Sequence, residues 1–221
     1  MTTLAAIFDL DGTVLNTLPD LADSLNLALE AAGYPTHDLE GFRPMVGGGM
    51  AKMIERALPE GSKNPETLAK VMAYFKKEYA KRQCDKTVPY DGIVELLKDL
   101  AAKGWLLGLL SNKDHENTLE VVGHFFPGLF SKIIGVRPGF PTKPDPSGAL
   151  EICQAFGLSP SQVFYVGDSG VDMATAKGAG CRPIGVAWGF RPKDELLAGG
   201  ALAILEEPCD FLEVAANLPN P

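Results

Sequence analysis

The sequence lacks a long hydrophobic run, and this absence excludes a membrane-spanning helix. Hydrophobic residues make up 46% of its 221 positions and charged residues 22%, yet no stretch approaches the ~20 consecutive apolar residues that such a helix requires. The first apolar run is interrupted by Asp9 and Asp11 and follows no basic segment, so we expect no signal peptide. The composition is typical of a soluble globular protein.

Cysteine and basic residues are also scarce. The four cysteines lie far apart in the sequence and form no CxxC pair, which argues against a disulfide framework or a cysteine zinc site; they are Cys84, Cys153, Cys181 and Cys209. We therefore expect buried, reduced thiols in a cytoplasmic protein. Lys and Arg number 20 against 28 Asp and Glu, a net charge of −8. This balance argues against nucleic acid and anionic membranes as partners, but not against a small anionic ligand.

Short apolar runs alternate with segments of helical period along most of the chain. The runs cover residues 4–8, 105–110, 133–136, 163–166 and 184–187, with a further candidate for an edge strand at 202–205. In one intervening segment, apolar residues repeat as on one face of a helix: Ile93, Leu96, Leu97, Leu100 and Ala101. The alternation predicts an α/β fold with a Rossmann-like, three-layer core, in which helices cover both faces of a mainly parallel sheet.

One stretch interrupts this alternation. Residues 17–86 contain no convincing strand and at least three segments of helical period. We predict that residues 17–86 form a small α-helical cap domain inserted after the first strand, and that residues 1–16 and 87–221 form the core. Methionine and aromatic residues at helical spacing are more often core than cofactor ligands, so we assign those in the insertion to its own core.

Polar residues follow four of the predicted strands. They lie at 9–13 (DLDGT), 111–113 (SNK), 142–144 (TKP) and 167–172 (GDSGVD). Ligands of parallel α/β sheets bind at the carboxyl ends of the strands, where these segments would meet. Any one of them could be a helix cap or a turn, but all four together favour a functional site.

The acidic residues of these segments predict a metal site. Asp9 and Asp11 are two positions apart, so in extended backbone they face one side, and closely spaced carboxylates drive their pKa values apart. Asp168 and Asp172 would bring up to four carboxylates around Lys143. Such a cluster requires a cation, and hard oxygen ligands select Mg²⁺. Carboxylates, Mg²⁺, a lysine and a hydroxyl are the groups that phosphoryl transfer needs.

The four segments resemble the four ordered motifs of the haloacid dehalogenase-like hydrolases. The likeness covers nearly the whole chain, and the predicted insertion sits where this family places its first type of cap. Within the superfamily, the chain is most similar to phosphoglycolate phosphatases, on residues 46–49 (VGGG), on SNK at 111–113, and on the run from GDS at 167–169 to AGC at 179–181.

The resemblance implies a role for each motif residue. Asp9 would be the nucleophile that becomes an aspartyl-phosphate. Asp11 would be the acid for the leaving alcohol and then the base for water. Ser111 would hydrogen-bond the transferring phosphoryl group, and Lys143 would stabilise its charge.

The remaining motif residues would bind metal and substrate. Asp168 would bind Mg²⁺ with the Asp9 carboxylate and the Asp11 carbonyl, and Asp172 would support the ion directly or from behind. We place Thr13 and Asn112 with the substrate-binding residues.

The predicted cap would select the substrate. Gly48 and Gly49 open a helix, and a glycine-rich helix start offers backbone amides to an anion. Arg43 could contact a substrate carboxylate. The alternatives are a flexible hinge or turn for the glycines and an ordinary surface charge for the arginine.

These interpretations predict a cytoplasmic, Mg²⁺-dependent phosphatase for a small phosphate monoester, with 2-phosphoglycolate as the leading candidate. A sugar phosphomutase of the β-phosphoglucomutase type would share the core motifs and differ in its cap. A phospho-accepting signalling receiver would use similar residues but has a smaller fold without a cap. The sequence leaves the oligomeric state open.

Overall fold

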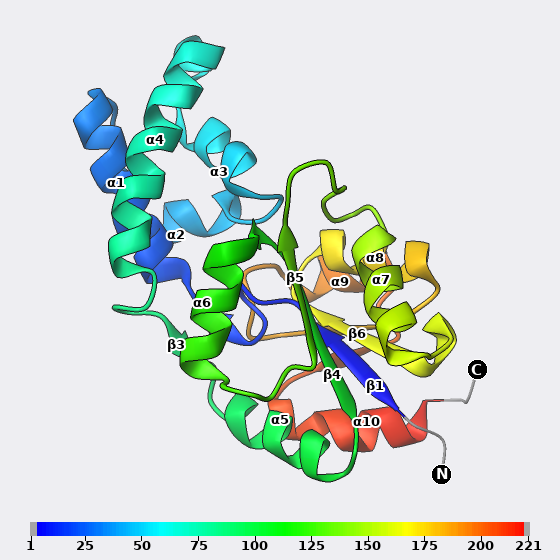
Figure 1. Cartoon of the computed structure of the whole chain (residues 1–221). Coiled ribbons are helices and arrows are strands. Elements are labelled where there is room, and N and C mark those ends of the chain that lie inside the picture. The colour runs from blue at the N-terminus through cyan, green and yellow to red at the C-terminus, as the bar shows by residue number, and fades with distance from the viewer. Residues whose placement is uncertain (1–3, 219–221) are drawn as a thin grey trace. The chain divides into compact units, whose positions relative to one another are not determined.

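A computed structural model describes residues 4–218, and its central feature is a six-stranded sheet (Figure 1). The strands lie in the order β5-β4-β1-β6-β7-β8 and all neighbours are parallel. Their bounds are Ala5–Phe8 (β1), Leu106–Asp114 (β4), Lys132–Val136 (β5), Val163–Gly167 (β6), Arg182–Val186 (β7) and Ala203–Leu205 (β8). The α/β fold with a parallel sheet is therefore confirmed.

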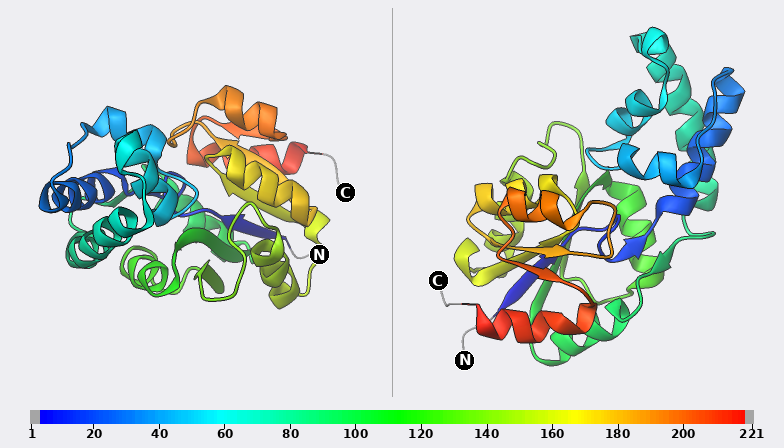
Figure 2. Two further views of the ribbon diagram at one scale, coloured as in Figure 1. Left: turned by 90° about the horizontal axis from the view of Figure 1, so that it is seen from above. Right: turned by 180° about the vertical axis from the view of Figure 1, so that it is seen from behind.

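Helices cover both faces of this sheet, which gives the three layers. They are α5 (Ile93–Ala102), α6 (His115–Phe125), α7 (Ser147–Phe156), α8 (Gly170–Ala179), α9 (Lys193–Gly199) and α10 (Phe211–Asn217). Helices α7 and α8 contact each other and pack on the face that carries Ile7 and Tyr165 (Figure 2). On the other face, Phe211 of α10 packs against Phe8 and Phe164, with ring centroids 6.1 and 5.7 Å away.

Strand β4 is longer than the apolar pattern predicts. The apolar run ends at Leu110, but the strand continues through the polar segment to Asp114, where the pairing with β5 shifts register. Ser111 and Lys113 therefore belong to the strand and do not follow it. The apolar run ended early because the last residues of this strand carry polar side chains, which hydrophobic periodicity does not detect.

The chain divides into two compact units. The first takes the described residues up to Leu15 and from Pro89 onward, and the second is Asn16–Val88. The chain passes between them through a two-stranded sheet of β2 (Leu15–Asn16) and β3 (Val88–Pro89), which the sequence pattern did not reveal. Two residues are too few to show a strand periodicity.

The second unit is helical. Its helices are α1 (Leu18–Ala32), α2 (Leu39–Phe42), α3 (Met50–Ala57) and α4 (Pro65–Arg82). Phe75 and Tyr79 on α4 stack with centroids 5.3 Å apart and are buried. The buried carboxylate of Asp20 accepts hydrogen bonds from the backbone of Lys86 and from the backbone and hydroxyl of Thr87. Asp20 thus fixes Lys86 and Thr87, at the end of this unit, to the first turn of α1.

The cysteines only partly follow the expectation of buried thiols. Cys153 and Cys181 are buried, but Cys84 is half-buried and Cys209 is exposed, and none of the four takes part in a disulfide. Cys209 lies in a short 3₁₀ turn, Pro208–Asp210, in which only Pro208 is buried. Within residues 4–218, no helix combines the length and the hydrophobicity needed to cross a bilayer.

Candidate active site

Lys143 forms the centre of a buried ionic cluster at the carboxyl end of the sheet. Its Nζ lies 2.7 Å from Oδ1 of Asp9, which follows β1, and 2.7 Å from Oδ1 of Asp172 on α8. All three side chains are buried. Burial lowers the pKa of Lys143, but the carboxylates of Asp172 and Asp9 outweigh it, so this pKa lies well above its usual value. The lysine is therefore charged.

Three carboxylates share this cluster. Ligand oxygens of Asp9, Asp168 and Asp172 all lie within 4.8 Å of one another. Burial, and then the charge of Asp172, raise the pKa of Asp9 well above its usual value and that of Asp168 to about 7. One lysine does not neutralise three buried acids. A cation would, and an all-oxygen donor set fits Mg²⁺ better than zinc or copper.

Asp172 is held on both of its oxygens. Oδ1 accepts a hydrogen bond from Lys143 and lies 3.4 Å from the hydroxyl of Tyr165, a residue of β6. Oδ2 accepts from the backbone of Ser169 at 3.1 Å and from its hydroxyl at 2.5 Å, in a capping box that opens α8. Tyr165 was not among the residues predicted for the site, because it lies within an apolar run of strand length and such a position indicates core.

Two glycines allow the backbone to approach Asp168 closely. A Cβ at Gly12, where φ is +87°, would lie 2.4 Å from Oδ2 of Asp168, and one at Gly189 would lie 2.2 Å from its Cβ. The same Oδ2 accepts a hydrogen bond from the Phe190 backbone at 2.7 Å. The segment at 189–190 therefore positions Asp168, a contribution for which the sequence carried no recognisable motif.

Asp11 was predicted to lie with the carboxylates around Lys143, but its side chain contacts a different lysine. Its Oδ1 lies 3.3 Å from Nζ of Lys113, a second buried lysine. The carboxylates that raise the pKa of Asp9 most are Asp172 and Asp168, not Asp11. Lys113 was not predicted to be a site residue. The signal that could have identified it is its spacing of two from Ser111, which in extended backbone places both side chains on one face of β4.

The other core residues singled out from the sequence lie at the same end of the sheet. Ser111 is buried and its Oγ accepts from the Lys113 backbone at 3.1 Å. The side chain of Asn112 donates to the Lys143 carbonyl and accepts from the Lys143 amide, at 3.0 and 2.9 Å. Asn112 thus anchors the loop that carries Lys143.

Thr13 lies in the loop after β1 and is fully buried. Its carbonyl accepts from the Trp188 indole at 2.9 Å. Its hydroxyl has no hydrogen-bond partner among the residues the structure describes.

The three residues proposed for substrate binding in the cap belong to the second unit. Arg43 is exposed at the start of a 3₁₀ turn, Arg43–Met45. Gly48 and Gly49 have φ values of +81° and +91°, and Gly49 caps the start of α3. Arg56 of α3 donates to the carbonyls of Met45 and Gly47, so this glycine segment is tied to its own helix. The roles of Arg43, Gly48 and Gly49 stay predictions.

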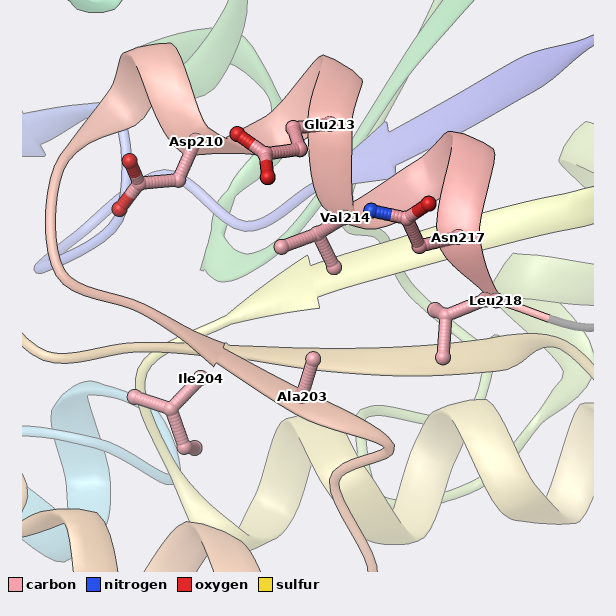
Figure 3. Close-up of a pocket in the computed structure, with 7 residues that line it drawn as sticks. All are labelled: Ala203, Ile204, Asp210, Glu213, Val214, Asn217 and Leu218. Carbon is pink, nitrogen blue, oxygen red and sulfur yellow. The ribbon is translucent and has the colours of Figure 1, made fainter.

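A pocket of about 380 Å³ lies elsewhere, between β8 and α10 (Figure 3). None of the residues that line it belongs to the four motifs. The lining residues are Ala203, Ile204, Asp210, Glu213, Val214, Asn217 and Leu218. It lacks the convergence of lysine and carboxylates described above, and we do not assign it to the active site.

Comparison with known proteins agrees with this geometry. The profile of the haloacid dehalogenase-like hydrolase family matches residues 6–186. A phosphoglycolate phosphatase of Thiobacillus denitrificans is 32% identical over 199 residues, covering 87% of this chain and 88% of that protein. One from Mannheimia succiniciproducens is 32% identical over 214 residues, covering 94% and 96%. The crystal structure of a predicted phosphoglycolate phosphatase from Haemophilus somnus superimposes with a TM-score of 0.89, at 29% identity and with 97% and 99% of the two chains covered.

The parallel sheet and the acidic cluster at its carboxyl end, together with this match, define the class of protein. The chain belongs to the haloacid dehalogenase-like hydrolase family. Within that family it is a phosphoric monoester hydrolase.

Proposed function

We propose that this chain is a Mg²⁺-dependent phosphatase that hydrolyses a small phosphate monoester, with 2-phosphoglycolate as the leading candidate, through an aspartyl-phosphate. The observation that carries the proposal is the buried Lys143, held between Asp9 and Asp172 beside Asp168. This arrangement offers a nucleophilic oxygen next to a fixed positive charge, in a site with an excess of acid for a metal ion. Uncatalysed hydrolysis of phosphate monoesters is so slow that nucleophilic and electrostatic catalysis are both needed.

The first step transfers the phosphoryl group to the protein. A carboxylate oxygen of Asp9 attacks phosphorus, and the bond to the ester oxygen breaks. The proton of Asp11 goes to the leaving alcohol. Lys143 stabilises the negative charge on the transferring oxygens, and the hydroxyl of Ser111 donates a hydrogen bond to one of them.

The second step restores the enzyme. Asp11, now ionised, takes a proton from water, whose oxygen attacks the phosphorus of the aspartyl-phosphate. The bond between phosphorus and the Asp9 oxygen breaks, and inorganic phosphate is released. Lys113, whose Nζ lies 3.3 Å from Oδ1 of Asp11, supports this part of the proposal because the contact holds the Asp11 carboxyl group in place.

Mg²⁺ would be held by the carboxylates of Asp9 and Asp168 and by the Asp11 carbonyl. It would supply positive charge that neutralises the phosphoryl oxygens. Asp172 is proposed as a support, because both of its oxygens are already bound by Lys143 and Ser169. Asn112, bonded twice to the Lys143 backbone, is proposed to position Lys143, and Thr13 stays a candidate for substrate contact.

The substrate is proposed from the relatives, which carry the name phosphoglycolate phosphatase and align over most of their length. Arg43 and the amides of Gly48 and Gly49 are candidates for the non-reacting carboxylate of such a substrate. The four cysteines, none of which takes part in a disulfide, support a reducing, cytoplasmic location.

The test is phosphate release from a panel of monoesters with and without metal. We expect 2-phosphoglycolate to give the highest kcat/KM among phosphoglycolate, sugar phosphates, nucleotides and pyrophosphate. EDTA should remove activity and Mg²⁺ restore it. Mg²⁺ should also raise the Tm of the wild-type protein but not of Asp168→Asn, because that variant has lost a metal ligand.

Three outcomes would redirect the proposal. Full activity in EDTA would contradict the metal site. Conversion of glucose 1-phosphate to glucose 6-phosphate without free phosphate would identify a phosphomutase. A stable phosphoprotein without turnover on any ester would identify a receiver.

Asp11→Asn should separate substrates by their leaving group. We expect the first-turnover release of alcohol from an alkyl phosphate to fall by about 10²–10⁴-fold, because the alkoxide has lost its acid. Release of p-nitrophenolate should fall far less, since that group needs little protonation. Rapid-quench measurement of the first turnover is required because the second step is common to both esters. Equal losses on both esters would contradict the role of Asp11 as acid.

A further inference from the structure

Two buried thiols face each other inside the first unit. Cys153 lies on α7, and Cys181 follows Gly180, the cap residue of α8, immediately before β7. Their sulfurs are 3.7 Å apart although the residues are 28 positions apart in the chain. The side chains are only 2% and 6% exposed and share one apolar cluster under the sheet. The mechanism uses neither of them.

We propose that Cys153 and Cys181 form a modification site for a small hydroperoxide, which oxidises the pair to an intramolecular disulfide. The sulfurs have to approach by only about 1.6 Å to reach the ~2.05 Å of a disulfide bond. Burial restricts the oxidant to a small, uncharged molecule, and a bulky disulfide such as oxidised glutathione does not reach them. This inference does not rest on the proposed phosphatase mechanism.

The two thiols differ in a way that assigns their roles. The hydrogen bond with the Cys181 thiol lowers the pKa of Cys153, whereas that hydrogen bond and burial raise the pKa of Cys181. The thiolate is the nucleophile in thiol chemistry. Cys153 is therefore the attacking residue and Cys181 the resolving one.

Each step balances with the peroxide as the sole oxidant. The Cys153 sulfur attacks one peroxide oxygen, the O–O bond breaks, and the departing hydroxide takes up a proton, which leaves a sulfenic acid. The Cys181 sulfur then attacks the Cys153 sulfur, the S–O bond breaks, and the oxygen leaves as water with the Cys181 proton. Two thiols have lost two electrons and two hydrogens, and hydrogen peroxide has become two waters.

The cross-link would join α7 and α8 at the end remote from the catalytic residues. The loop that carries Lys143 leads into the start of α7, and α8 carries Asp172 in its first turn. At the catalytic end, the Lys143–Asp172 ion pair already links α8 to the loop before α7. A disulfide between Cys153 and Cys181 therefore fixes the other end of the same pair of helices, and it should stabilise the fold without disturbing the site.

The experiment uses hydrogen peroxide on the full chain. The background is a Cys84→Ser/Cys209→Ser variant, which keeps only the buried pair, and the matched control adds Cys153→Ala. After treatment and alkylation under denaturing conditions, neither cysteine of the background variant should be alkylated, and the mass of the chain should be lower by two hydrogens. Non-reducing electrophoresis should show a monomer, and peptide mapping should give one cross-linked peptide. The Tm of the background variant should rise by about 5–10 °C and return on addition of dithiothreitol. The control should show no such rise.

Other outcomes overturn the proposal. They are two alkylated thiols after treatment, a sulfinic acid at Cys153 in place of the bond, or dimers linked between chains. If the background variant folds poorly, peptide mapping of the oxidised wild-type chain decides the same question, because the cross-linked peptide either contains Cys153 and Cys181 or does not.

Discussion

Replacing Asp9 with Asn is expected to lower kcat on a phosphate monoester by on the order of 10⁴-fold or more. The amide has no anionic oxygen to attack phosphorus, so the aspartyl-phosphate cannot form. The measurement is phosphate release in saturating substrate and Mg²⁺. A quenched reaction of the wild-type protein with labelled substrate should in addition yield an acid-stable, hydroxylamine-sensitive phosphoprotein, which Asp9→Asn should not give.

The fold should survive this substitution. Burial and the charge of Asp172 disfavour the ionised form of Asp9 and raise its pKa, so a neutral amide removes a cost of folding at neutral pH. Lys143 keeps its contact with Asp172. We therefore expect the free energy of unfolding to stay the same or increase. Asp99→Asn, on the exposed side of α5, is the matched control and should retain full activity. Wild-type turnover by Asp9→Asn would rule out Asp9 as the nucleophile.

Lys143→Met is expected to affect both activity and stability. We expect kcat to fall by about 10³-fold, because the positive charge next to the transferring phosphoryl group is lost. The free energy of unfolding should fall by about 3–5 kcal/mol, because the buried carboxylates of Asp9 and Asp172 lose their shared partner. Urea unfolding followed by tryptophan fluorescence measures this loss, since Trp105 and Trp188 both lie in the first unit.

Added Mg²⁺ distinguishes the electrostatic cause from a simple packing defect. A cation among the same carboxylates offsets part of their repulsion, so Mg²⁺ should recover more stability in Lys143→Met than it adds to the wild-type protein. Lys98→Met, on the exposed side of α5, should change neither activity nor stability. A Lys143→Met variant as stable as the wild-type protein without metal would contradict the central place of Lys143 in the cluster.

Much of the first unit could be predicted from local sequence patterns. The five apolar runs and the candidate edge strand all correspond to strands of the parallel sheet. Parallel strands bring their carboxyl ends to one side, and this rule alone was enough to expect Asp9, Lys143, Asp168 and Asp172 near one another. The strand bounds were less accurate where polar functional residues continue a strand, as in β4 from Ser111 to Asp114.

Local patterns could not decide which lysine pairs with which carboxylate. Asp11 and Lys113 are 102 positions apart, and their contact depends on the register between β1 and β4, in which Phe8 lies opposite Leu109. A slip of one residue would turn each side chain on a strand to the opposite face. The sequence therefore led to a cluster of up to four acids around Lys143, whereas Asp11 contacts Lys113.

The class of fold, the family, and the set of residues from which the candidate site is built could all be inferred without coordinates. These follow from periodicity and from motifs that are local in the chain. The folded structure was needed to see that Asp172 is held on both oxygens, that Tyr165 and the segment at 189–190 support the acids, and that Cys153 and Cys181 face each other. Such contacts join residues distant in sequence, and they exist only once strand register and helix packing are fixed.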